Sequence, residues 1–107
     1  MAGIALDKRI EEALTLIEGR TPEEKIVFSV IKVLEHRLED CHRKLGSYEA
    51  KYGMPFRSFI RAWEKGEIPG KHSSEVESDY MDWEAYEMER RNLLRVLRKL
   101  RPVVSKN

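Results

Sequence analysis

The sequence predicts an all-α protein: an elongated antiparallel hairpin of two long helices with two shorter helices packed on it. Apolar residues recur at spacings of three and four along most of the chain, and no stretch shows the strict alternation and hairpin turns of a β-sheet. Charged residues make up 36% of the chain, against roughly 25% in an average globular protein. An elongated helical hairpin exposes enough surface to carry the additional charged residues. A chain of 107 residues is expected to form a single domain, here residues 1–107.

The first short helix is expected over residues 7–18. Asp7 is a candidate N-cap, and Gly19 supplies a stop signal after the last turn. The apolar face of this helix is marked by residues spaced by four, three and four, namely Leu6, Ile10, Ala13 and Ile17.

The first long helix is expected over residues 22–52. Thr21 can cap it, Pro22 suits its first position, and Glu24 can close a capping box. Spacings of four and three continue for more than three heptads, which predicts a seam for a second helix. The seam consists of Val27, Ile31, Leu34, Leu38, Cys41, Leu45, Tyr48 and Tyr52.

A second apolar stripe, Ile26, Val30 and Val33, runs beside the first half of this seam. It predicts that the opening turns of the helix are buried on a wide face. Gly46 lies off the seam, so the helix is expected to continue through it at a cost of about 1 kcal/mol relative to Ala. A break at Gly46-Ser47 is the alternative.

The second short helix is expected over residues 55–65, after a stop at Gly53-Met54-Pro55. Phe56, Phe59, Ile60 and Trp63 line one side of it. The following stretch, residues 67–73, contains Pro69 and Gly70 and is expected to be a solvated loop.

The last helix is expected over residues 75–101, with Ser74 and Glu77 as a second capping box and Pro102 as its stop. Its acidic residues come first and its basic residues, from Arg90 to Arg101, come last, which complements the helix dipole. Asp79 and Arg90 interrupt an apolar heptad pattern that forms the second seam. This seam consists of Val76, Trp83, Tyr86, Leu93, Leu97, Leu100 and Val104. Pairing with the helix over residues 22–52 would bury both seams.

Composition restricts the partners and the compartment. The net charge is +1, so no overall field draws the chain to nucleic acid or to an anionic membrane, and we expect neither partner. One cysteine, no apolar run long enough to span a membrane and no signal peptide near Met1 predict a soluble cytoplasmic protein. The absence of Gln and the scarcity of Asn suggest a thermophilic source.

A docking surface for a protein partner is predicted in the aromatic and acidic stretch of the last helix. Apolar side chains lie nearly all round it, and Trp, Tyr and Met are common at binding hot spots. The alternative is that the second short helix packs there and completes an internal core. The candidate partner-binding residues are Tyr80, Met81, Trp83, Tyr86 and Met88, together with Leu38, Leu45, Tyr48 and Tyr52 of the seam.

Catalytic, metal and cofactor motifs are absent from the sequence. Cys41, His36, His42 and His72 lack the spacing of metal ligands, and phosphate-binding loops and nucleophile elbows are missing. The spacing of Arg37 and His42 matches the loose pattern of HEPN-type helical ribonucleases, in which such residues meet across a dimer. We therefore keep a ribonuclease toxin as an alternative and expect no catalytic residues otherwise.

The middle of the chain carries a family resemblance. The residues concerned are Tyr48 to Met54, Phe56 and Phe59, Lys65-Gly66-Glu67, and Asp79 to Ala85. In this order, over about 60 residues, they resemble short helical proteins of heat-loving archaea and bacteria that are identified as antitoxins of toxin–antitoxin pairs. The chain departs from that pattern at Pro55, where a polar capping residue is common.

The resemblance implies a protein that wraps or plugs a toxin, often a nuclease, and holds it inactive. The leading hypothesis is thus a non-enzymatic, antitoxin-like protein-binding module without a cofactor. A further alternative is a self-associating coiled-coil scaffold, in which the seam from Leu38 to Tyr52 meets its own copy in a homodimer.

Overall fold

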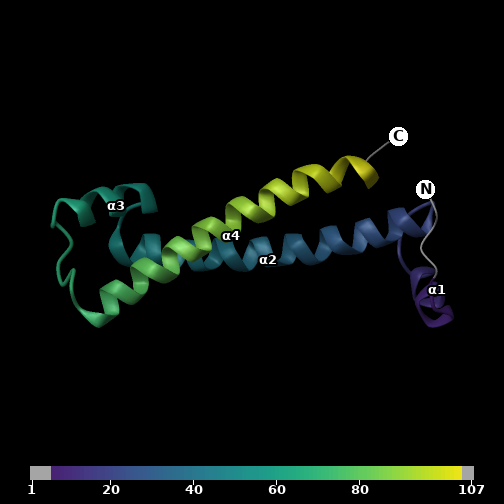
Figure 1. Ribbon diagram of the computed structural model, residues 1–107, viewed down its shortest axis with the longest axis horizontal. Helices are drawn as coiled ribbons and strands as arrows, with labels where there is room; N and C mark the ends of the chain where they lie inside the picture. Colours follow the sequence, from purple (N-terminus) through teal and green to yellow (C-terminus); the bar gives the residue numbers. More distant parts are fainter. Residues whose placement is uncertain (1–5, 105–107) are drawn as a thin grey trace.

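Two helices of 31 residues each run antiparallel along the length of the protein (Figure 1). In the computed structural model, which describes residues 6–104, α2 spans Pro22–Tyr52 and α4 spans Ser74–Val104. The shorter helices are α1, Lys8–Leu14, and α3, Phe56–Glu64. The expected all-α fold of two long and two short helices is confirmed, and residues 6–104 contain no strand. The molecule extends over 57 × 28 × 24 Å.

The N-terminal helix α1 is shorter than predicted. Asp7 caps it as expected, by accepting a hydrogen bond from the backbone N–H of Arg9 at 2.7 Å. The helix ends at Leu14 because the next turn tightens: the N–H of Leu16 bonds the carbonyl of Ala13, and the Thr15 hydroxyl bonds the carbonyl of Glu12. Tight turns of this kind commonly end helices. The residues before Leu6, where we expected no signal peptide, lie outside the described part of the chain.

Thr21 caps α2 as predicted, while the Glu24 carboxylate bonds the residue before the cap instead of Thr21 itself. The Thr21 hydroxyl accepts from the N–H of Glu24 at 3.1 Å, and the Glu24 carboxylate accepts from the N–H of Arg20 at 3.0 Å. The helix continues through Gly46, which decides between the two alternatives. It ends at Gly53, whose φ of 70° is the left-handed conformation that glycine adopts most easily.

The segment between α2 and α4 is more buried than predicted. Pro55 provides no side-chain hydrogen bond to α3, as its lack of a polar group requires. The loop after α3 was expected to be solvated throughout, but Ile68 is buried against the aromatic cluster. Ile68 is the only large apolar residue of that loop, and its burial anchors the loop to the hairpin.

Both ends of α4 differ from the prediction. Ser73, not Ser74, caps the helix, since its hydroxyl accepts from the N–H of Val76 at 3.2 Å. The helix also includes Pro102 and runs to Val104. Pro102 removes one backbone hydrogen bond and crowds the carbonyl four residues earlier, but only Val103 and Val104 follow it, so the cost is confined to the last turn.

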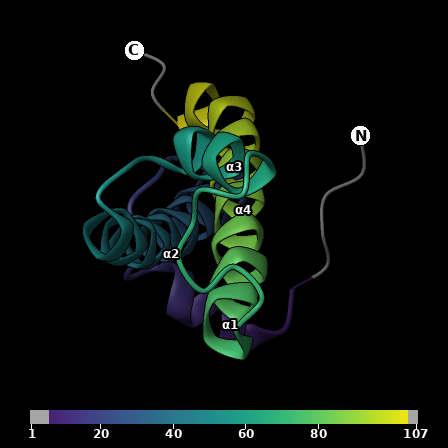
Figure 2. The same ribbon diagram turned by 90° about the vertical axis from the view of Figure 1, so that its left-hand side faces the viewer.

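α2 and α4 contact each other at several levels, through different faces of α2 at each level. Lys51 contacts Glu75 near the α3 end, Cys41 contacts Tyr86 in the middle, and Glu35 contacts Arg101 near the other end. The two ribbons cross obliquely in Figure 1, while Figure 2, seen from the α3 end, shows α3 beside α4. α3 and α1 therefore lie at opposite ends of the hairpin.

Candidate functional site

An aromatic cluster joins α2, α3 and α4, and it contains most of the predicted partner-binding residues. Trp83 is fully buried: its ring centroid lies 4.9 Å from that of Phe59, 5.6 Å from Tyr48 and 5.7 Å from Tyr52. Tyr80 is half-buried, edge-on to Trp63 at 4.7 Å, and Tyr86 is half-buried near Tyr48. This side of α4 forms the internal core that we held as the alternative, so we no longer include Trp83 in a docking surface.

The seam residues of α2 are occupied within the chain. Leu45 is buried and Leu38 half-buried, on the face of α2 that packs against α4. A homodimer through the seam from Leu38 to Tyr52 would therefore have to displace α4.

Asp79 interrupts the heptad pattern because its carboxylate links α4 to α2 through hydrogen bonds. Its carboxylate accepts hydrogen bonds from the Lys51 ammonium and the Tyr52 hydroxyl, both at 2.6 Å. Burial alone would raise the pKa of Asp79, but these two hydrogen bonds outweigh it and lower that pKa below its ordinary value. Burial and the bond to Asp79 raise the pKa of Tyr52 to about 12.

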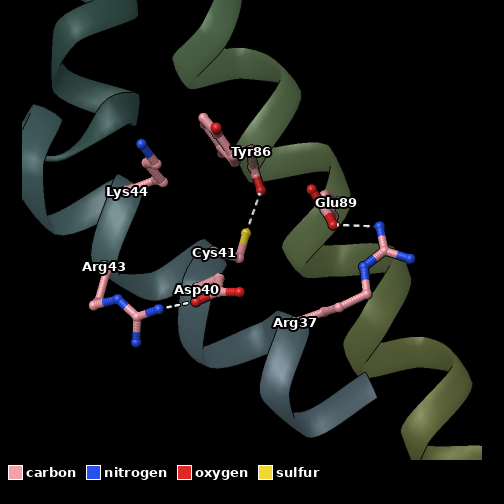
Figure 3. Close-up of a pocket in the computed structure, with 7 residues that line it drawn as sticks. All are labelled: Arg37, Asp40, Cys41, Arg43, Lys44, Tyr86 and Glu89. Carbon is pink, nitrogen blue, oxygen red and sulfur yellow. Dashed lines mark hydrogen bonds and ion pairs between the residues drawn. The ribbon is translucent and has the colours of Figure 1, made fainter. Parts of the chain in front are cut away.

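A polar hollow of about 330 Å³ lies between α2 and α4 (Figure 3). The Cys41 thiol forms its floor and donates to the backbone carbonyl of Tyr86 at 3.0 Å. Burial raises the pKa of this thiol, which keeps it protonated and a poor nucleophile. Two ion pairs lie around it, since Arg37 pairs with Glu89 at 2.6 Å and Arg43 pairs with Asp40, and Lys44 completes the charged lining.

Arg37 and His42, the two residues of the ribonuclease hypothesis, do not converge. They are five residues apart on α2 and therefore point about 140° apart around the helix axis. Arg37 reaches across to Glu89 of α4, as Figure 3 shows, whereas His42 is exposed. Nothing within residues 6–104 forms a hydrogen bond or ion pair that orients the His42 ring. A ribonuclease site made by one chain thus gains no support from this geometry.

The methionines of the predicted docking stretch lie outside the core. Met81 is 70% exposed and Met88 is 62% exposed, and both belong to the side of α4 that faces away from α2. At the end nearest α3, Met81 helps to line an apolar hollow of about 310 Å³ together with Trp63, Glu77 and Tyr80. Of the predicted partner-binding residues, Met81 and Met88 are the two that remain free for a partner.

A second exposed apolar surface lies on α2, where sequence reasoning expected burial. Val30 is 41% exposed and Val33 is 60% exposed, while Ile26 is half-buried. We call these three residues the α2 stripe. The prediction was wrong because α4 crosses to the other side of α2 at this end, where Glu35 contacts Arg101. The sequence signal was the stripe itself, but its exposure depends on the crossing.

The part of the chain that the structure describes offers no metal site, since no three His, Cys, Asp or Glu side chains are grouped to hold an ion. No helix in that part is both long and apolar enough to pass through a membrane.

Comparison with known proteins identifies the chain at the level of its family. No curated protein and no solved structure matches it. A protein-family model described as the Uncharacterized protein MJ0235 family matches residues 1–104. That description names no partner, substrate or reaction. Because the match extends over nearly the whole chain and includes all four helices, the chain belongs to the MJ0235 family.

Proposed function

We propose that the chain is a non-enzymatic protein-binding module, and that it acts as an antitoxin-like neutraliser of a toxin. The observation that carries the proposal is the α2 stripe, because Val30 and Val33, one helical turn apart, remain exposed beside the seam of α2 that packs against α4. Contiguous apolar surface on a small protein marks a docking site more often than isolated apolar residues do.

Docking, and not chemistry, accounts best for the side chains that are available. The buried thiol of Cys41 is held protonated, and both acidic side chains around it are already engaged in ion pairs with Arg37 and Arg43. An apolar helix face, in contrast, can be laid into a groove of another protein, with anchors at spacings of three and four residues. The toxin as partner is taken from the resemblance of about residues 40–100 to antitoxins.

A binding measurement with propensity-matched variants tests this proposal. The chain would be co-expressed with the protein encoded by the neighbouring gene, and the purified pair titrated by calorimetry. Val30→Ser with Val33→Ser should raise Kd at least tenfold, since it removes buried apolar contacts, and should leave the thermal midpoint nearly unchanged, since serine and valine have similar helix propensities.

The matched control is His42→Ser, which changes an exposed residue on the side of the same helix opposite Val33 and should leave Kd unaltered. The proposal fails if no neighbour-encoded protein binds, or if the double variant binds as tightly as the native chain. Binding that is lost together with the helical circular dichroism would be repeated with Val33→Ser alone, which exposes no new surface of the core.

A further inference from the structure

The outer face of α4, opposite α2, is a continuous exposed stripe of seven residues. Spacings of three and four place them within one side of the helix, and all of them are exposed: Glu77, Met81, Glu84, Met88, Arg91, Arg95 and Lys99. We use "outer face" for these residues. It contains the two exposed methionines and lies on the side of α4 opposite α2, with Trp63 of α3 bordering its first turns.

The charges of the outer face are separated along the helix. Glu77 and Glu84 belong to its first half, and Arg91, Arg95 and Lys99 to its second half. The helix dipole accounts for charges in the first and last turns only, whereas Glu84 and Arg91 lie well inside a helix of 31 residues.

Within the chain the two halves of the outer face are too far apart to attract each other, and the basic half repels itself weakly. The three basic residues follow one another at spacings of four, and like charges at that spacing repel. Among the described residues, Glu77 approaches His72 at 3.8 Å and Arg95 binds Asn92 at 2.6 Å, but no ion pair joins the acidic half of the face to its basic half. A second surface with the opposite order of charges would bring the acidic and basic halves of the face into attractive contact.

We propose that the outer face of α4 is the interface of an antiparallel homodimer, with a two-fold axis at Met88. Rotation about that axis sets Glu77 opposite Lys99 of the second copy and Glu84 next to Arg91 of the second copy, while each Met88 meets its counterpart. Such an isologous interface is self-complementary in both charge and apolar character. The contacts span about 33 Å of helix.

The hollow at the acidic end of the face fits the same arrangement. It is lined by Trp63, Glu77, Tyr80 and Met81, and it lies opposite Arg95 and Lys99 of the second copy. A long basic side chain suits it, because the aliphatic stem can pack on apolar walls and the cation can reach both Glu77 and the face of an aromatic ring. This dimer leaves the α2 stripe free, so it does not depend on the proposed toxin binding.

Charge reversal tests the pairing. The two variants are Glu77→Lys with Glu84→Lys, which makes the face basic, and Arg91→Glu with Arg95→Glu, which makes it acidic. In analytical ultracentrifugation the native chain should sediment as a dimer of 12.6 kDa subunits. Each variant alone should dissociate at least tenfold more readily, and an equimolar mixture should form a heterodimer. Glu12→Lys with Glu39→Lys, exposed residues off the face, is the control that matches the change in charge of the first variant.

Cross-linking tests the position of the axis. Met88→Cys should form an intermolecular disulfide on mild oxidation, since a residue on a two-fold axis meets itself, whereas His36→Cys should not. The native Cys41 is buried and should not interfere. A native chain that stays monomeric at about 100 μM overturns the proposal, because a specific interface of this length should bind more tightly. So does a dimer that survives both charge reversals, or a mixture of the two variants that does not pair.

Discussion

The two ends of the hairpin bury their apolar side chains to different extents. At the α3 end, three helices and the loop residue Ile68 enclose a cluster in which Trp83 and Phe59 have no exposed surface. At the α1 end, Ile31, Leu93 and Leu97 are buried, but Val33 and Leu16 remain 60% and 86% exposed. Two crossed helices can hide one stripe each, and a third element is needed to cover a second stripe.

The difference between the two ends follows from the helices that reach them. α3 brings Phe56, Phe59 and Trp63 to the side of α4 that carries Tyr80. α1 has only seven residues, none of which is buried. The α3 end should therefore carry most of the stability, while the α1 end should carry the surface that is available for a partner.

The largest expected effect comes from truncating the aromatic cluster. Phe59→Ala should lower the free energy of unfolding by about 3–5 kcal/mol, because it removes a fully buried ring and leaves a cavity. Leu16→Ala at the α1 end should change it by less than about 0.5 kcal/mol. Urea unfolding curves measure both. Equal losses at the two sites would show that the ends are equally well packed.

Replacing Asp79 should give the next largest change in the free energy of unfolding, and this change should depend on pH. Asp79→Asn should cost about 1 kcal/mol at neutral pH, because a charged acceptor for Lys51 and Tyr52 is lost. The pKa of Asp79 is lowered by folding, so its contribution is present above about pH 4, its unfolded pKa, and is lost as the pH falls through the lower folded value.

The contribution of Tyr52 to stability has the opposite pH dependence, because it is lost at alkaline pH. Its pKa is raised from 10.0 to about 12 in the folded chain, so its contribution is present below pH 10.0 and is lost as the pH rises through about 12. Thermal midpoints recorded between pH 3 and 12 should fall at both extremes for the native chain. In Asp79→Asn the fall of the thermal midpoint at acid pH should be smaller than in the native chain. An equally large fall would show that Asp79 is not the group responsible.

The smallest effect is expected at Gly46. A methyl group added there meets no atom within 4 Å, and the residue lies inside α2, so Gly46→Ala should stabilise the chain by about 0.5–1 kcal/mol. A rise in the thermal midpoint without loss of partner binding would show that Gly46 lowers the stability of α2 and has no role in binding. A fall in the midpoint would show that the helix is distorted at this position.

The helices themselves could largely be predicted from the sequence because their signals are local. Thr21 with Glu24, and Gly53 with its left-handed backbone, fix the ends of α2 through hydrogen bonds to neighbours within four residues. The heptad spacing predicted which faces of α2 and α4 meet. Where the local signals were nearly degenerate, as between Ser73 and Ser74, the predicted boundary was displaced by one residue.

The sequence by itself thus determined an all-helical hairpin, its four helices and its two apolar seams. Only the tertiary structure decided which further apolar residues are covered: Ile68 and Trp83 are buried, whereas Val30, Val33, Met81 and Met88 are exposed. The physical reason is that periodicity depends on residues a few positions apart, while burial depends on the angle at which distant helices cross and on the reach of the element that closes each end.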